Sequence, residues 1–309
     1  MNLVFPHTFV PWFRTVAPHI HAYHGKTFVV AIAGELIAAG KLASFAQDLA
    51  ILQAMGIKIV LVHGFRPQVN EQLRSKGHAS RHSHGMRITD PVALDSAQEA
   101  AGQLRFEIEA AFSQGLPNTP MANAIVRVVS GNFLTARPVG VVDGVDFMHS
   151  GVVRKVDAAA IRRAIDIGAM VLLSPFGFSP TGEAFNLTME DVATSTAIAL
   201  QADKLLFITE VPGIHEDLSD PESPIDTELA LADAERLLAQ LPRPTQPIDP
   251  AFYLQHCVRA CRGGVERSHI LPFAMDGALV KRSRTEIERD IGHYKIGRAS
   301  CRERVSVRV

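Results

Sequence analysis

The chain has few of the residues that mark secreted, membrane-spanning or nucleic-acid-binding proteins. Only 3 of its 309 residues are cysteines, which is too few for a disulfide framework and indicates a reducing compartment. Aromatic residues are scarce at 6%, and the formal net charge of -1 gives no sign of a basic nucleic-acid surface. No apolar run is as long as a membrane span, which needs about 18 residues. Met1 to Phe13 lacks the features of a signal peptide. We therefore expect a cytoplasmic protein with no nucleic-acid or membrane partner.

Metal ligands are also scarce, although two groups of residues invite that interpretation. Cys257 and Cys261 have the i,i+4 spacing of one helix face, but no second pair completes a tetrahedral site. We interpret them as small apolar residues. His78, His82 and His84 have poor ligand spacing without a carboxylate partner, and we interpret them as solvated loop histidines. The sequence predicts no metal site.

Hydrophobic residues are plentiful at 47%, and apolar segments of two kinds alternate along the chain. Short strands are predicted at 28–33, 58–62, 170–173, 205–209 and 268–271. Helices are predicted between them at 9–24, 42–55, 67–75, 157–167, 188–200 and 251–262. This order predicts an α/β fold in which an open, mostly parallel sheet lies between two helix layers.

Three further segments break the alternation. Residues 124–142 are predicted as a hairpin around Ser130-Gly131-Asn132. The stretch 218–227 is rich in Asp, Pro and Ser, and 241–250 contains four prolines, so both are predicted as surface loops.

Two glycine-containing loops follow the first two predicted strands. They are Ala31-Ile32-Ala33-Gly34-Glu35 and His63-Gly64-Phe65-Arg66-Pro67-Gln68-Val69-Asn70. In open α/β sheets, ligands bind where strands end and helices begin. Glycines at such turns let backbone N–H groups approach an anion. The sequence therefore predicts a ligand pocket between these loops.

The second loop resembles that of the amino-acid kinase family, and the resemblance spans residues 26–276. Acetylglutamate kinases are the most similar kinases. Gly85-Met86-Arg87-Ile88-Thr89-Asp90 resembles their substrate-carboxylate loop. Residues 185–188 and 203–214 resemble the nucleotide side of the same fold. The resemblance implies the amino-acid kinase fold, a three-layer α/β/α arrangement.

The catalytic groups of those kinases are missing. Phosphoryl transfer depends on positioning and on charge stabilisation, and losing one stabiliser typically costs about 3–4 kcal/mol. By resemblance, Ala31 and Tyr253 replace two lysines, Glu190 replaces an aspartate, and Phe65-Arg66 replaces two glycines. We predict no catalytic residue and a vestigial kinase pocket formed by Ala31, Gly34, Gly64, Arg66, Arg87, Asn186, Glu190 and Tyr253.

Other segments resemble the N-acetylglutamate synthases, in which a kinase-like domain precedes an acetyltransferase domain. These segments are residues 63–68, 129–133, 149–151, 260–265 and 269–270. The resemblance implies a parent enzyme that transfers acetyl from acetyl-CoA to L-glutamate, giving N-acetyl-L-glutamate in the first step of arginine biosynthesis. Acetyl-CoA would be the co-substrate of the full-length protein, and no cofactor is expected in this chain.

The same resemblance implies allosteric regulation by L-arginine. In arginine-sensitive members, an N-terminal helix interlaces with a neighbouring subunit of a hexamer, and the inhibitor binds beside it. The corresponding positions here are Phe13, Gly264, Val265 and His269. The alternative for His269 is a half-buried strand histidine with a backbone partner.

The chain is therefore expected to contain four parts. They are an oligomerisation helix (1–25), a kinase-like domain (26–276), a fragment resembling part of an acetyltransferase (277–294), and a tail (295–309). Lys295 to Val305 is what a common sequencing adapter encodes in translation, so the tail is predicted to be an artefact with no fold or function. Arg74–Ala79 fits a coenzyme A loop string, but it ends a predicted helix and is interpreted as chance.

Three functional hypotheses follow. The leading one is the regulatory, scaffolding domain of an N-acetylglutamate synthase that lacks catalysis alone. The second is a small-molecule kinase similar to acetylglutamate kinase, with rearranged catalytic groups. The third is a free-standing arginine-sensing protein.

Overall fold

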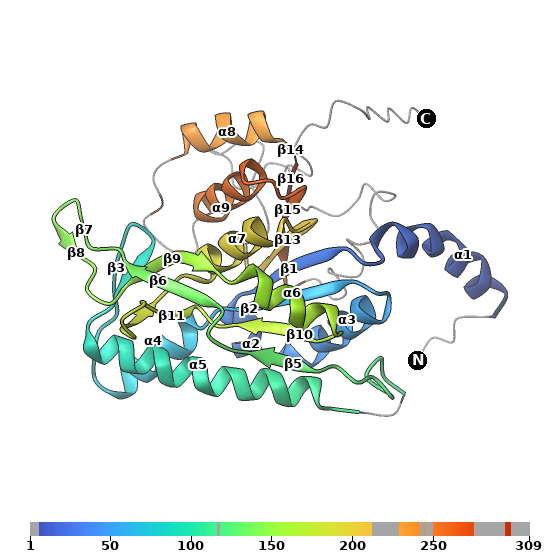
Figure 1. Ribbon diagram of the computed structural model, residues 1–309, viewed down its shortest axis with the longest axis horizontal. Helices are drawn as coiled ribbons and strands as arrows, with labels where there is room; N and C mark the ends of the chain where they lie inside the picture. Colours follow the sequence, from blue (N-terminus) through green and yellow to red (C-terminus); the bar gives the residue numbers. More distant parts are fainter. Residues whose placement is uncertain are drawn as a thin grey trace.

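A mostly parallel sheet forms the centre of the protein in a computed structural model that describes residues 6–115, 118–211, 229–241, 244, 250–274 and 294–297 (Figure 1). Within these ranges the sheet has eight strands in the order β14-β16-β15-β13-β1-β2-β10-β5. Their bounds in that order are Leu229–Ala230, Tyr294–Gly297, Arg267–Pro272, Lys204–Thr209, Thr27–Ile32, Lys58–His63, Met170–Leu173 and Val128–Ser130. The predicted open sheet is confirmed.

The central strands are continuous apolar runs because both faces of the sheet are covered. In β1, every residue from Phe28 to Ile32 is buried. Successive side chains point to opposite faces, so Val29 and Ala31 enter one hydrophobic cluster while Phe28, Val30 and Ile32 enter the other. The core is therefore two apolar layers with the sheet between them.

One face of the sheet is covered by helices that lie before residue 113 in the chain. Buried side chains of these helices join the cluster that contains Phe28 and Val30. The helices are α2 (Gly34–Ala38), α3 (Leu42–Ala54), α4 (Arg66–Ser75) and α5 (Pro91–Phe112). The long helix α5 was not among the predicted elements, and it packs through alanines such as Ala97 and Ala100, which have no exposed surface.

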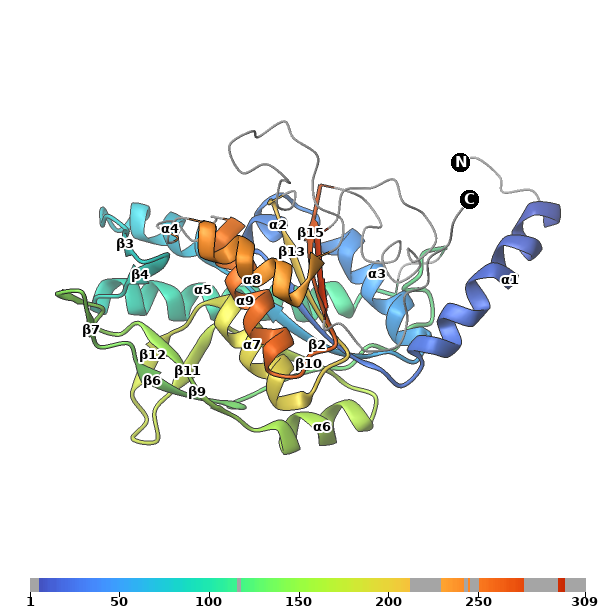
Figure 2. The same ribbon diagram turned by 90° about the horizontal axis from the view of Figure 1, so that it is seen from above.

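The opposite face is covered by helices from the second half of the chain (Figure 2). These are α6 (Ala158–Asp166), α7 (Met189–Leu200) and α9 (Pro250–Arg262), with α8 (Leu231–Gln240) lying over α9. Asp157 and Thr188 cap α6 and α7, since each side chain accepts a hydrogen bond from a first-turn N–H group. The three-layer α/β/α arrangement is thereby confirmed.

A smaller mixed sheet in the described ranges has the order β12-β11-β6-β9. Its strands are Ala184–Asn186, Phe176–Phe178, Leu134–Pro138 and Gly151–Val156. Two short hairpins accompany it, β3–β4 (Arg81–Ser83 and Met86–Ile88) and β7–β8 (Val141–Val142 and Val145–Asp146). Figure 1 shows these elements beside the carboxyl ends of the central strands.

The predicted hairpin at 124–142 is wrong. Its two strands, β5 and β6, belong to different sheets, because β5 pairs in parallel with β10 and β6 pairs antiparallel with β9. The chain changes sheets at Gly131 and Asn132. Local turn residues can show that a strand ends, but they do not show which partner the next strand takes.

Helix α1 (Pro6–Tyr23) projects from the body of the protein (Figures 1 and 2). Its end is attached through Tyr23, whose hydroxyl accepts a hydrogen bond from Lys204 Nζ at 2.9 Å. The same ammonium lies 4.0 Å from the centroid of the Tyr23 ring and 5.3 Å from that of Phe28. In the described ranges, no helix is both long and apolar enough to cross a membrane.

Near the edge of the described sheet that β14 forms, β16 lies between β14 and β15. It pairs antiparallel with β15, for example Ser268 with Ile296. This differs from the prediction that residues 295–297 have no fold. The physical reason is that strand pairing uses backbone groups, which an exposed sheet edge offers to many sequences. The origin of residues 295–309 stays a prediction, and the predicted loops at 218–227 and 241–250 fall almost wholly outside the described residues.

Asp90, which caps α5, is expected to contribute to folding in a pH-dependent way. Its carboxylate accepts a bond from Ala93 N at 2.9 Å and lies 2.7 Å from His78 Nε2. Burial would raise the pKa of Asp90, but the Ala93 N–H and the nearby cations lower it overall. The stabilisation is therefore present above the ordinary value of about 3.9 and is lost as pH falls through the lowered value.

Replacing Asp90 by alanine should lower the free energy of unfolding by about 1 kcal/mol at pH 7, measured by urea denaturation. The loss should shrink at pH 2. Asp157→Ala is the matched control for the loss of a cap bond, because Asp157 caps α6 in the same way and accepts from Ala160 N at 2.9 Å. Equal stability of the Asp90 variant and the parent at pH 7 would contradict the prediction.

Candidate functional site

A cavity lies at the carboxyl ends of the central strands, between the two helix layers and the smaller sheet. Its lining comes from the loops after β2 and β10, from the β3–β4 hairpin, from the start of β9, from the end of β12 and from the start of α7. The lining residues are Gly64, Phe65, Arg66, His82, Gly85, Met86, Arg87, Ser150, Gly151, Pro175, Asn186, Leu187, Thr188, Met189 and Glu190. This is the position that the topology of a parallel sheet predicts for a ligand site.

Close packing of two strand-to-helix turns sets the position of Arg66. A Cβ atom on Gly64 would lie 2.9 Å from the backbone nitrogen of Gly34, so only glycine lets the turns approach this closely. Helix α4 begins at Arg66, and Pro67 in its first turn suits that start. Gln68 Nε2 then donates to the Gly34 carbonyl at 3.0 Å. The Arg66 side chain is thereby directed across the carboxyl edge of the sheet.

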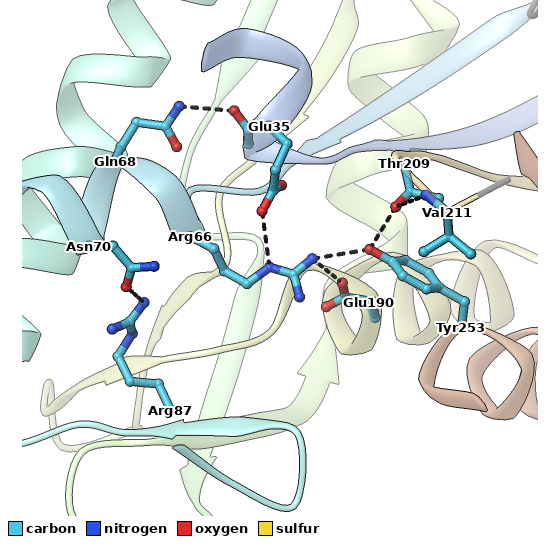
Figure 3. A network of polar contacts seen from close by, with 10 residues as sticks. Glu35, Arg66, Gln68, Asn70, Arg87, Glu190, Thr209, Val211 and Tyr253 are labelled. Atoms are coloured by element: carbon cyan, nitrogen blue, oxygen red, sulfur yellow. Dashed lines mark hydrogen bonds and ion pairs between the residues drawn. The ribbon is translucent and has the colours of Figure 1, made fainter. Parts of the chain in front are cut away.

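Arg66 is the centre of a polar network that joins both helix layers (Figure 3). Its Nη2 donates to Tyr253 Oη at 3.0 Å and to Glu190 Oε1 at 3.3 Å. Its Nε lies 3.9 Å from Glu35 Oε1. The phenol oxygen of Tyr253 also accepts a bond from Thr209 Oγ1 at 3.1 Å. The guanidinium is therefore held by partners on α2, α7 and α9.

Burial and charge act together on the ionisation of this network. Burial disfavours the charged form of Arg66, but the carboxylates of Glu190 and Glu35 outweigh burial and raise its pKa. Burial raises the pKa of Glu190, and Arg66 opposes that shift. Burial also raises the pKa of Tyr253. Arg66 is thus a permanent cation, while Tyr253 stays a neutral phenol at physiological pH.

Arg87 is the second cation of the cavity, and it has neutral partners. Its guanidinium donates to Asn70 Oδ1 at 2.8 Å and to Ser80 Oγ. Only 7% of Arg87 is exposed. Burial and the charge of Arg66 lower the pKa of Arg87 to about 10. The same two effects, with the charge of Arg87 added, lower the pKa of His82 to about 4, so this histidine is neutral at pH 7.

Asn186 adds a neutral polar group to the lining. Its amide nitrogen donates to Thr89 Oγ1 at 3.0 Å, but its buried Oδ1 has no hydrogen-bond partner among the described residues. Arg66 Nη1 is likewise buried without a partner in the same part of the chain. Both atoms have almost no accessible surface, so this donor and this acceptor are not exposed to the cavity.

The structure brings together five of the eight residues predicted for the vestigial kinase pocket. Gly64, Arg66, Arg87, Asn186 and Glu190 all line the cavity.

The other three predicted residues do not line it, which corrects the prediction. Ala31 is inside β1 with no exposed surface, because its one-carbon side chain is covered by the core under α7. Tyr253 is wholly buried behind Arg66 and acts as its partner. Gly34 belongs to the supporting turn, where its carbonyl accepts a bond from Gln68.

Sequence reasoning missed the roles of Glu35 and Thr209. Glu35 flanks the Arg66 guanidinium, and Thr209 hydrogen-bonds the phenol that receives it. The only signal for Glu35 is its place in the turn after β1, since the carboxyl ends of neighbouring parallel strands meet at one edge. Thr209, the last residue of β13, carries the same signal.

The residues predicted to bind L-arginine are divided by the sheet. Val265 packs in the cluster with Ile270, on the α9 side. His269 is buried on β15, next in sequence to Ile270, so its side chain points to the opposite face. Gly264 has a left-handed φ of 111°, and the side chain of Phe13 lies outside the described residues. Their convergence on one ligand stays a prediction.

The cysteines and loop histidines also have clear places. Cys257 and Cys261 are buried in the core, and burial raises the pKa of Cys257. The three histidines differ from the prediction of solvated side chains, because each is half-buried. His78 contacts Asp90, His84 contacts Asp143 and His82 lines the cavity. Within the described ranges, no group of three potential ligands could hold a metal ion.

Replacing Arg66 by methionine should lower the free energy of unfolding by about 3–5 kcal/mol, because it leaves the buried Glu190 carboxylate without its cation. The double variant Arg66→Met with Glu190→Gln should regain much of this loss. The single variant should fold more readily when Glu190 is protonated, because no unpaired carboxylate is then buried. Its destabilisation should therefore decrease as pH is lowered from 8 towards 5. Urea denaturation at several pH values measures both effects, and a pH-independent loss would contradict this explanation.

Similarity to known proteins agrees with this architecture. The curated amino-acid acetyltransferase of Ralstonia nicotianae is 56% identical over 272 residues, which are 88% of this chain and 59% of that protein. The corresponding protein of Ectopseudomonas mendocina is 44% identical over 274 residues, or 89% of this chain and 62% of that protein. This chain therefore spans about 60% of the length of these relatives.

Two solved structures share the fold. N-acetylglutamate synthase from Neisseria gonorrhoeae, complexed with coenzyme A and L-arginine, has a TM-score of 0.82 and 36% identity, over 94% of this chain and 65% of that one. Carbamate kinase from Giardia lamblia bound to AMP-PNP has a TM-score of 0.67 at 15% identity, over 89% of this chain and 99% of that one, and shows likeness of fold alone. A profile of the amino acid kinase family matches residues 26–272. The chain therefore belongs to the amino acid kinase family.

Proposed function

We propose that this chain is the kinase-like regulatory domain of an amino-acid N-acetyltransferase, an N-acetylglutamate synthase. The parent reaction would transfer acetyl from acetyl-CoA to L-glutamate at the start of arginine biosynthesis. Relatives named amino-acid acetyltransferase and the N. gonorrhoeae structure support the parent activity. Those proteins extend well beyond the part that this chain matches, so the chain alone is expected to lack acetyl transfer.

The use of Arg66 as an internal cation is the observation that carries the proposal of a retired kinase. Phosphoryl transfer needs cations or bare backbone N–H groups that receive the migrating group. Here the guanidinium is paired with Glu190 and Glu35 and hydrogen-bonded to a neutral phenol. The place that a second lysine would take by resemblance is held by the buried Tyr253. We therefore assign the pocket a structural role.

Regulation by L-arginine is the second part of the proposal. The N. gonorrhoeae structure contains L-arginine and coenzyme A, and its likeness to this chain supports an effector role for the kinase-like domain. We place the effector near Gly264, Val265 and His269, beside α1. Residues 1–25 would be an oligomerisation helix in a homo-oligomer, a hexamer by resemblance, and the projection of α1 from the body fits contact with another subunit (Figure 2).

The proposal includes the domain assignments made from the sequence. Residues 26–276 would form the kinase-like domain, 277–294 would be a fragment resembling part of an acetyltransferase, and 295–309 would be a translated adapter sequence, although residues 295–297 pair with β15. L-glutamate and acetyl-CoA would be ligands of the full-length protein. We place the protein in the cytoplasm, as expected for an enzyme of arginine biosynthesis.

The purified chain should not form ADP from ATP in the presence of N-acetyl-L-glutamate. The expected rate in a coupled ADP assay equals that of a protein-free mixture, because Arg66 is paired with carboxylates and the buried Tyr253 holds the place of a second lysine. Glu190→Ala is the control. Turnover that this substitution abolishes would overturn the proposal in favour of a small-molecule kinase.

L-arginine should bind the chain in isothermal titration calorimetry, with heat detectable at millimolar ligand. His269→Ala should weaken binding at least tenfold, which corresponds to about 1.4 kcal/mol. L-lysine is the matched ligand control, because it carries a cation without the planar guanidinium fork. Absence of heat at millimolar L-arginine would count against the regulatory function, and unchanged affinity in the variant would remove His269 from the site.

A further inference from the structure

Helices α7 and α9 lie side by side and are joined along their length (Figures 1 and 2). Thr194 Oγ1 and His256 Nδ1 are 3.3 Å apart, and both side chains are buried. Arg259 Nη2 donates to Asp191 Oδ1 at 2.6 Å. Each helix is internally rigid because every turn is closed by backbone hydrogen bonds. We therefore treat α7 and α9 as one body, the α7/α9 pair.

At one end of the α7/α9 pair, the residue that ends α7 contacts the turn that links α9 to β15. Gln201, the left-handed residue that ends α7, donates from Nε2 to the Gly263 carbonyl at 3.1 Å. A Cβ atom on Gly264 would lie 2.5 Å from Gln201 Oε1, so this contact is also sterically tight. The turn contains Gly264 and Val265, two of the positions proposed for the effector.

The other end of the α7/α9 pair is joined at the cavity by Arg66. Glu190 is the second residue of α7, Tyr253 is near the start of α9, and both contact the same Nη2 atom. Arg66 itself belongs to α4, on the opposite face of the sheet. The guanidinium thus connects the pair to the layer that lines the cavity from the other side.

We propose that Arg66 is a positioning residue through which the α7/α9 pair connects the turn at Gly264 to the cavity. A displacement of that turn would move the pair as a body, and Arg66 would pass the movement to α4 and to the lining. This inference rests on the proposed function, because it names the route by which an effector at the turn would act. Arg66 would thus transmit movement in addition to pairing with Glu190.

Carbon-13 NMR of the chain labelled at its methionine methyl groups tests the connection. The sequence has 8 methionines, and Met86 lines the cavity from β4, outside the α7/α9 pair, so the Met86→Leu variant identifies the resonance that reports on the lining. Gln201→Ala removes the bond to Gly263 without changing a glycine, and Gly264→Ala strains the turn directly. Both should shift the Met86 resonance. Gly182→Ala is the matched control, since Gly182 has a φ of +85° and open space around a Cβ atom.

The same two changes are then made together with Arg66→Met, and with Arg66→Lys in case the methionine variant does not fold. Lysine keeps the charge but loses the planar fork that holds two partners. In either background the shift of the Met86 resonance should fall to less than half, because the lining would no longer follow the α7/α9 pair. An unmoved Met86 resonance in both turn variants, or an equal shift with and without Arg66, would overturn the proposal.

Titration with L-arginine separates this inference from the proposed function. If calorimetry shows binding and the Met86 resonance moves only when Arg66 is present, the connection is supported. If L-arginine binds and the resonance does not move, the proposed function stands and the connection is overturned. If L-arginine does not bind, the proposed function fails, and the turn variants alone decide the connection.

Discussion

The arrangement of the carboxyl edge of the sheet depends on where the Arg66 charge is placed. A buried guanidinium is tolerable only with anionic or strongly polar partners, and this chain supplies them from α2, α7 and α9. Satisfying Arg66 in this way fixes the spacing of helices on opposite faces of the sheet. The Arg66 charge is also paired with carboxylates of the chain itself, whereas Arg87, the cavity's other cation, has neutral partners.

The fold follows closely from local sequence patterns. The strand at Met170–Leu173 has the predicted bounds, and Thr188 caps α7 at the start of the predicted helix. These elements are short apolar runs or capped helices, whose signals are contained within a few residues. The pairing of β5 is different, because its partner β10 lies some forty residues later in the chain and no local turn specifies it.

The site was only partly predictable, and distance along the sequence explains why. Glycine-containing turns after two parallel strands indicated Gly64 and Arg66 without any structure. The two hydrogen-bond partners of the Arg66 guanidinium, Glu190 and Tyr253, are 124 and 187 positions away in the chain, so no spacing rule connects them to it. Ala31 was assigned to the pocket by resemblance, but a methyl group cannot extend from a buried strand to a cavity wall.

The attachment of α1 has a consequence for how firmly that helix is oriented. The Lys204 ammonium is nearly buried, with only 5% of the residue exposed, and it faces the rings of Tyr23 and Phe28. Mobile ions screen such an enclosed cation–π contact far less than an exposed ion pair. Changes in ionic strength should therefore leave the direction of α1 unaltered, whereas loss of the Tyr23 ring would release it.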